Sequence, residues 1–83
     1  MTKSQKQKFL KELEDLLGRL SIQIRHERGD FQGGLCVFDD QSYFILNKNH
    51  SIEQKLGILR TDLKHIDLED TFIRPALREF LDL

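Results

Sequence analysis

Residues 33–66, GGLCVFDDQSYFILNKNHSIEQKLGILRTDLKHI, decide the fold of this chain. Two apolar runs, 35–38 and 43–46, flank a short polar segment at 39–42, which is the pattern of a β-hairpin. Both runs are apolar on both faces, as expected for strands at the centre of a small sheet. A polar link then leads into a helix. We therefore expect a strand–turn–strand–helix unit that the remaining segments cover.

The helix of this unit is predicted over residues 51–66. Ser51 is followed three residues later by Gln54, which is the capping-box pattern of a helix N-terminus. Apolar side chains then recur at spacings of three and four residues, which places them on one helical stripe. The members of that stripe are Ile52, Leu56, Leu59, Leu63 and Ile66.

A second amphipathic helix is predicted at the N-terminus. Either Thr2 with Gln5 or Ser4 with Gln7 can form its capping box, and Gly18 is expected to end it. Residues 20–25 then alternate between apolar and polar, as in a half-buried strand. A last helix is predicted to start near Pro75, with Ala76, Leu77, Phe80 and Leu81 as its buried stripe.

These elements predict one α+β domain over residues 1–83. We expect an N-terminal helix, a three-stranded antiparallel β-meander, and two C-terminal helices packed on one sheet face. The chain is short, so its core is thin and oligomerisation would help its stability. A homodimer or an unknown protein partner is therefore the predicted assembly.

Composition excludes several classes of protein. The net charge is −1, so no global attraction toward nucleic acid or membrane is expected. One cysteine excludes an internal disulfide framework and a multi-cysteine zinc site. No apolar run approaches the roughly 18 residues of a membrane span, and the charged N-terminus lacks a signal-peptide core. We expect a cytoplasmic protein without a cofactor.

The charged segment before the glycine pair is the candidate binding loop. Loops carry binding residues more often than the elements that they connect. The glycine pair also allows unusual backbone angles or a close backbone approach. The candidate residues are Arg25, His26, Arg28, Asp30, Gln32, Gly33 and Gly34.

A degenerate zinc motif lies on the predicted central helix. Thr61, Asp62 and His65 occupy the positions of His, Glu and the second His in H-E-x-x-H, where both histidines bind the metal. One histidine cannot hold zinc alone, so Asp62 and His65 are only weak metal candidates and no metal site is predicted. Cys36 is expected to be a buried, inert thiol.

Residues 43–65 resemble the strand-to-helix segment of zincin-like metallopeptidases of the ImmA/IrrE type. The compatible residues are Asn47, Asn49, Ser51, Glu53 and His65. Thr61 and Asp62 depart from the zinc motif, so the resemblance implies a similar strand–strand–helix shape without peptidase activity. The longer pattern from the glycine pair through P-A-L-R-E-F-L resembles small bacterial proteins with no assigned activity, which implies a bacterial origin.

Two functions from different classes remain open. The first is a non-catalytic interaction or structural module, so we lean against an enzyme. The alternative is a degenerate zincin-like domain, or a catalytic or metal-binding domain that uses Cys36 with His26, His50 or His65. A weaker third idea is nucleic-acid binding by the lysines between Lys3 and Lys11, which the balanced net charge disfavours.

Overall fold

The first helix, α1, spans Lys3–Arg19 in the computed structural model, which describes residues 2–83. Its N-terminus is a capping box. The Gln5 amide donates to Thr2 Oγ1 at 3.2 Å, and the Thr2 amide donates to Gln5 Oε1 at 2.9 Å. Of the two predicted caps, the structure therefore contains the one at Thr2, where two otherwise unpaired backbone donors are satisfied.

The end of α1 lies beyond the predicted Gly18. Ser21 adopts a left-handed conformation with φ 61°. The Ile22 amide donates to Leu17 O at 2.9 Å, and the Ser21 amide donates to Gly18 O at 3.1 Å. These two bonds form a Schellman motif, in which the left-handed position is usually glycine. The prediction was wrong because serine occupies that position and Gly18 remains helical.

Three strands form a mixed sheet, β1 (Gln23–Glu27), β2 (Gly34–Phe38) and β3 (Gln41–Asn47). The strand order is β1-β3-β2. β2 and β3 pair antiparallel as the predicted hairpin, whereas β1 pairs with β3 in parallel. The predicted antiparallel meander is therefore wrong, although the α+β class is confirmed.

The edge position of β1 has a physical reason. β2 and β3 each carry an unbroken apolar run, at 35–38 and 43–46, whereas β1 alternates with Gln23 and Arg25. An inner strand is paired along both edges, so it suits the more apolar segment, and the polar strand remains at the edge. The connection 28–33 crosses the C-terminal end of β3 to reach β2. Because β1 and β3 end at the same side of the sheet, they run in parallel.

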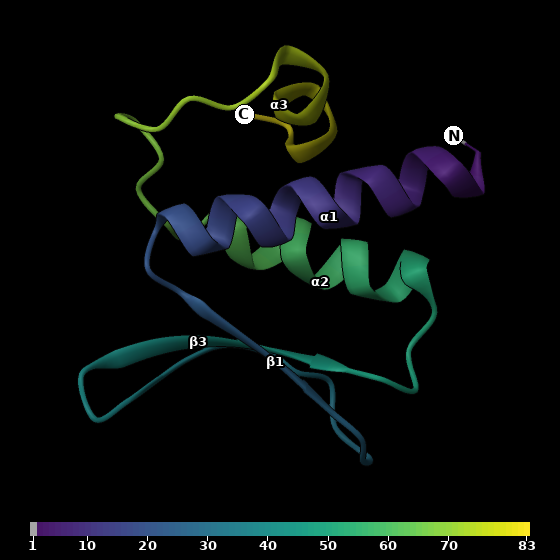
Figure 1. Cartoon of the computed structure of the whole chain (residues 1–83), viewed down its shortest axis with the longest axis vertical. Helices are drawn as coiled ribbons and strands as arrows, with labels where there is room; N and C mark the ends of the chain where they lie inside the picture. Colours follow the sequence, from purple (N-terminus) through teal and green to yellow (C-terminus); the bar gives the residue numbers. More distant parts are fainter. Residues whose placement is uncertain (1) are drawn as a thin grey trace.

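In the described part of the chain, the helices all lie on one side of this sheet. Figure 1 shows α1 and α2 (Ile52–Leu63) side by side above the strands, with α3 (Pro75–Leu81) on the far side of the helix pair. The rings of Phe9 and Phe80 lie 5.3 Å apart, so α3 packs on α1. The prediction that both C-terminal helices pack on the sheet is thus right for α2 and wrong for α3, because α1 takes the second place.

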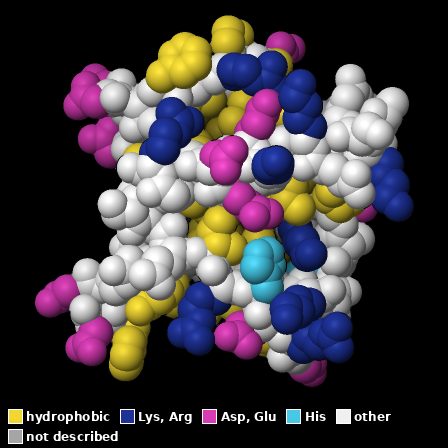
Figure 2. Space-filling model, viewed as in Figure 1, with side chains coloured by type: hydrophobic (Ala, Val, Ile, Leu, Met, Phe, Trp, Pro, Cys, Tyr) yellow, Lys and Arg dark blue, Asp and Glu magenta, His cyan; other side chains and the backbone are white. Residues whose placement is uncertain are grey.

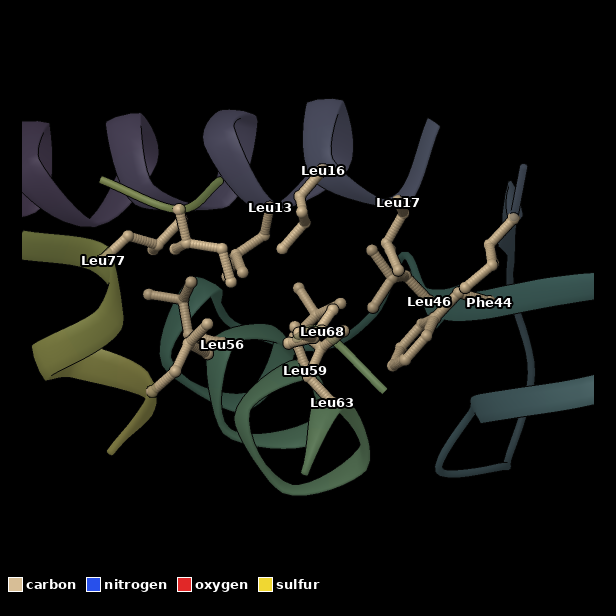
Figure 3. Packing of buried hydrophobic residues seen from close by; sticks show 13 residues of the cluster. Leu13, Leu16, Leu17, Phe44, Leu46, Leu56, Leu59, Leu63, Leu68 and Leu77 are labelled. Carbon is tan, nitrogen blue, oxygen red and sulfur yellow. The ribbon is translucent and has the colours of Figure 1, made fainter. Parts of the chain in front are cut away.

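The core lies between the helices and β3. Figure 3 shows leucines of α1, α2 and α3 pointing toward one another and toward Phe44 and Leu46 of β3. Phe44 and Leu46 are fully buried, as are Leu13, Leu16, Leu17 and Leu59. The capping box predicted at Ser51 is present, with the Ser51 amide donating to Gln54 Oε1 at 2.8 Å. The predicted helical stripes therefore form the core, except that Ala76, predicted to be buried in the last helix, is exposed.

One ion pair joins the first turns of α1 and α2. Lys6 Nζ lies 2.8 Å from Glu53 Oε1, and this hydrogen bond lowers the pKa of the Glu53 carboxyl below its usual value. A carboxyl whose pKa is lower in the folded than in the unfolded state stabilises the fold at pH values above its unfolded-state pKa. This stabilisation is lost as the pH falls through the folded-state pKa. We expect Glu53→Gln to remove this part of the acid dependence. Urea denaturation of the wild type and of Glu53→Gln between pH 3 and 7 measures the free energy of unfolding of each protein. An equal pH dependence in both would contradict this role of the ion pair.

Candidate functional site

Within residues 2–83, the sheet has one face that no helix covers. Side chains alternate along a strand, so Phe44 and Leu46 point to the helices, and Tyr43 and Ile45 point to the opposite face. Cys36 is paired with Tyr43 and shares this open face. Arg25 lies here too, with Cζ 5.8 Å from the centre of the Tyr43 ring. The open face is therefore partly apolar, with polar groups toward the β1 edge.

The outer edge of β2 is the second feature of this region. The Leu35 amide donates to Asp62 Oδ2 of α2 at 3.0 Å, so it points away from β3. In an antiparallel pair the outward and inward backbone groups alternate, and Val37, two residues on, therefore also points its amide and carbonyl outward. Asp62 covers one donor of the edge, and no group within residues 2–83 is bonded to the outward groups of Val37.

Apolar side chains are exposed along this edge. The exposed fractions are 36% for Leu35, 68% for Val37 and 71% for Phe38. At the lower left of Figure 2, where Figure 1 places the hairpin, apolar side chains reach the surface beside acidic ones. Asp39 and Asp40 form the two-residue turn, with φ 56° and 62°. A strand edge with exposed apolar side chains favours pairing with another chain.

A groove lies on the open face beside the start of β2. It has a volume of about 360 Å³, and its lining is mainly apolar. Phe31, Cys36 and Ile45 contribute to its walls, and Glu27 lies at the same groove. Gly33 has φ 87°, and a Cβ there would overlap Ile45 O, so only glycine lets the chain run this close to β3.

Asn47 holds the loop that borders the groove. Its side chain is 2% exposed and makes three hydrogen bonds. Nδ2 donates to Gly29 O at 2.8 Å and to Phe31 O at 2.7 Å, while Oδ1 accepts from the Asn49 amide at 2.9 Å. Because the two loop carbonyls are bound, the loop has a defined path over the end of β3.

A second groove lies on the other side of the same loop. Its volume is about 690 Å³, and it runs between the loop and α2. Its polar lining comes from Asp30 and Gln32 of the loop, and from His50, Gln54 and Thr61. Gly57 belongs to its floor, although nothing lies within 4 Å of a Cβ built there. The lining of this groove is polar and apolar in similar measure, and it contains no cluster of metal ligands among residues 2–83.

The candidate loop is divided among several surroundings. Arg25 and His26 belong to β1 and face opposite sides of the sheet, since His26 is paired with Leu46. Arg28 is exposed. Asp30 and Gln32 line the larger groove, and Gly33 and Gly34 line the apolar one. The structure therefore does not bring the seven residues into one site.

The weak metal candidates also lie in separate surroundings. Asp62 is half-buried and accepts the hydrogen bond from Leu35, whereas α2 ends at Leu63 and His65 is exposed in the following turn. Cys36 is only half-buried because it lies on the sheet face opposite the helices, so the prediction of a buried thiol is wrong. Across residues 2–83, no three His, Cys, Asp or Glu side chains are grouped so as to hold a metal ion.

Sequence reasoning missed the β2 edge and the role of Asn47. The apolar run 35–38 was interpreted as an inner strand, but it lies at the edge with its apolar side chains exposed. The sequence does contain a signal for exposure. Asp39 and Asp40 form a polar turn, and Val37 and Phe38 come directly before it, where few other helices or strands can cover them. The sequence also gives no sign of the hydrogen bonds from Asn47 to the loop.

No protein-family model, curated protein or solved structure matches this chain. Within residues 2–83, none of the helices has the length and apolar character needed to cross a bilayer. Figure 2 shows acidic and basic side chains interspersed over much of one molecular face, which fits the net charge of −1. The β2 edge and its adjoining groove are therefore the candidate functional surface of this chain.

Proposed function

We propose that this protein is a non-catalytic interaction module, and that it binds an extended segment of a partner protein along the β2 edge. The observation that carries the proposal is the exposure of Val37 and Phe38 on an edge strand whose outward backbone groups at Val37 are not covered by Asp62. An extended segment can add to such an edge through main-chain hydrogen bonds, and neighbouring grooves then select its side chains.

The groove on the open face supports the same mode of binding. An added strand would place every second side chain on the face that Cys36 and Ile45 occupy, beside the groove of about 360 Å³. The bacterial cytoplasm is the proposed setting. It is supported by the resemblance to small bacterial proteins and by a single cysteine that has no partner in the chain.

Val37→Pro tests this proposal. Proline has no amide hydrogen, and it is tolerated on an edge strand where that hydrogen faces solvent, so the β2–β3 bonds should persist. Peptides selected by the wild-type protein from a random nine-residue library should lose at least tenfold in affinity for the variant. Val37→Thr, which keeps the amide, should lose much less. Failure to select any peptide, or equal binding by Val37→Pro, would contradict the proposal.

A further inference from the structure

We infer that the segment bound at the β2 edge is basic, with lysine or arginine alternating with apolar residues. This inference rests on the proposed function and adds the chemistry of the partner. It starts from three carboxylates placed around the free edge. Asp39 and Asp40 lie at one end of β2, and Asp62 lies against Leu35 near the other. Within residues 2–83 none of the three takes part in an ion pair.

The position of Asp62 sharpens the argument. One of its oxygens accepts from the Leu35 amide, so the carboxylate occupies the edge at Leu35, and an added strand pairs with β2 from Val37 toward the hairpin turn. A second strand therefore meets a negative charge on both sides of the Val37 backbone groups. Carboxylates at a strand edge repel an acidic segment and attract a basic one, and this difference gives specificity as well as attraction.

The groove fits the same kind of side chain. Its walls include Phe31, Cys36 and Ile45, and the carboxylate of Glu27 lies at the same groove. Lysine and arginine lay their methylene stems on apolar surface and keep the charged end near water or an acid. Arg25 lies 3.6 Å from Glu27 Oε1 and neutralises part of that charge, so the three aspartates supply most of the discrimination.

Charge also argues against a second copy of this chain as the occupant. Two β2 strands paired antiparallel through Val37 would place Leu35 of one copy opposite Asp39 of the other. Asp62 would then face that Asp39, since it is bound at the Leu35 amide. Like charges directly across a strand pair are destabilising. The edge therefore favours a partner of opposite charge over self-pairing.

Two defined peptides test the inference. One has nine residues of alternating valine and lysine, and the other carries glutamate in place of lysine. At low salt we expect the lysine peptide to bind at least tenfold more tightly, and we expect this ratio to fall at high salt because the charges are screened. In the complex, exchange of the Val37 amide hydrogen should slow. That readout does not require a proline variant to fold.

The decisive variant removes the three charges and keeps their structural contacts. Asparagine tolerates the left-handed turn positions of Asp39 and Asp40, and its oxygen can replace Asp62 as acceptor for Leu35. D39N/D40N/D62N should bring the lysine-to-glutamate ratio close to one. The control D15N/D70N/E79Q removes the same charge from exposed residues outside β2 and its hairpin turn, and it should keep most of the preference.

Each outcome separates the inference from the proposed function. If both peptides bind equally and both slow the Val37 amide, the edge binds strands and the basic preference is wrong. If neither peptide affects that amide, the proposed function fails as well. A wild-type dimer in sedimentation that Val37→Pro dissociates would show that a second copy occupies the edge, which also overturns the inference.

Discussion

Replacing Gly33 with alanine is expected to destabilise the fold by about 3 kcal/mol or more. The added Cβ would overlap the carbonyl oxygen of Ile45, which belongs to the backbone of the inner strand and cannot move aside. The φ of 87° adds strain because side-chain-bearing residues rarely adopt it. A domain of this size has a total stability of about 4–12 kcal/mol, so the variant should lose a large part of it. Urea denaturation measures the loss.

Gly57→Ala is the matched control for this experiment. Gly57 lies within α2, and nothing comes within 4 Å of a Cβ built there. Alanine should therefore stabilise the helix by up to about 1 kcal/mol. Alanine would then lower the free energy of unfolding at Gly33 and raise it at Gly57 of the same protein. A tolerated alanine at Gly33 would contradict the described path of the chain before β2, and a loss of stability at Gly57 would contradict the open space described there.

Asn47→Asp should be the second strongly destabilising change, with an expected loss of about 3 kcal/mol at neutral pH. The variant keeps the size of the side chain, and one oxygen can still accept from the Asn49 amide. The other oxygen, however, faces the carbonyls of Gly29 and Phe31, to which the native amide donates. Two carbonyls lose their donor, and a negative charge is placed against them.

The pH dependence of the stability of Asn47→Asp provides a second test of this prediction. The facing carbonyls disfavour the charged form, so the introduced carboxyl holds its proton to higher pH in the folded than in the unfolded chain. Stability from such a group is present at low pH and is lost as pH rises. The variant should therefore approach the wild type as pH falls. Asn49→Asp is the control, since Asn49 is exposed and only its backbone amide contacts Asn47. An equal loss of stability in Asn49→Asp would contradict the hydrogen bonds described for Asn47.

Local features of this fold were predictable from the sequence because they depend on neighbouring residues. The capping box at Ser51 needs only Gln54, three residues away, and the leucine stripes need only the helical period. The hairpin follows from two apolar runs around a short turn, and Pro75 begins α3 as predicted. Each of these features is decided within about one helical turn or one hairpin.

The strand order was not predictable in the same way. Whether β1 pairs with β2 or with β3 depends on side chains that are distant along the chain, and both arrangements satisfy the alternation seen in β1. The candidate site shows the same limit. A run that is apolar on both faces, such as the one around Val37, is expected for an inner strand and for an exposed edge that binds a partner. Only the neighbours in space distinguish the two.

The placement of β3 between the other strands has a consequence for how the chain assembles during its synthesis. β1 leaves the ribosome well before its sole strand partner in this sheet, which ends at Asn47. The β2–β3 hairpin is contiguous in sequence and can close as soon as it emerges, because little chain entropy opposes it. Translation products that stop short of β3 therefore contain β1 and α1 without a sheet to join, and they expose the leucines that later form the core.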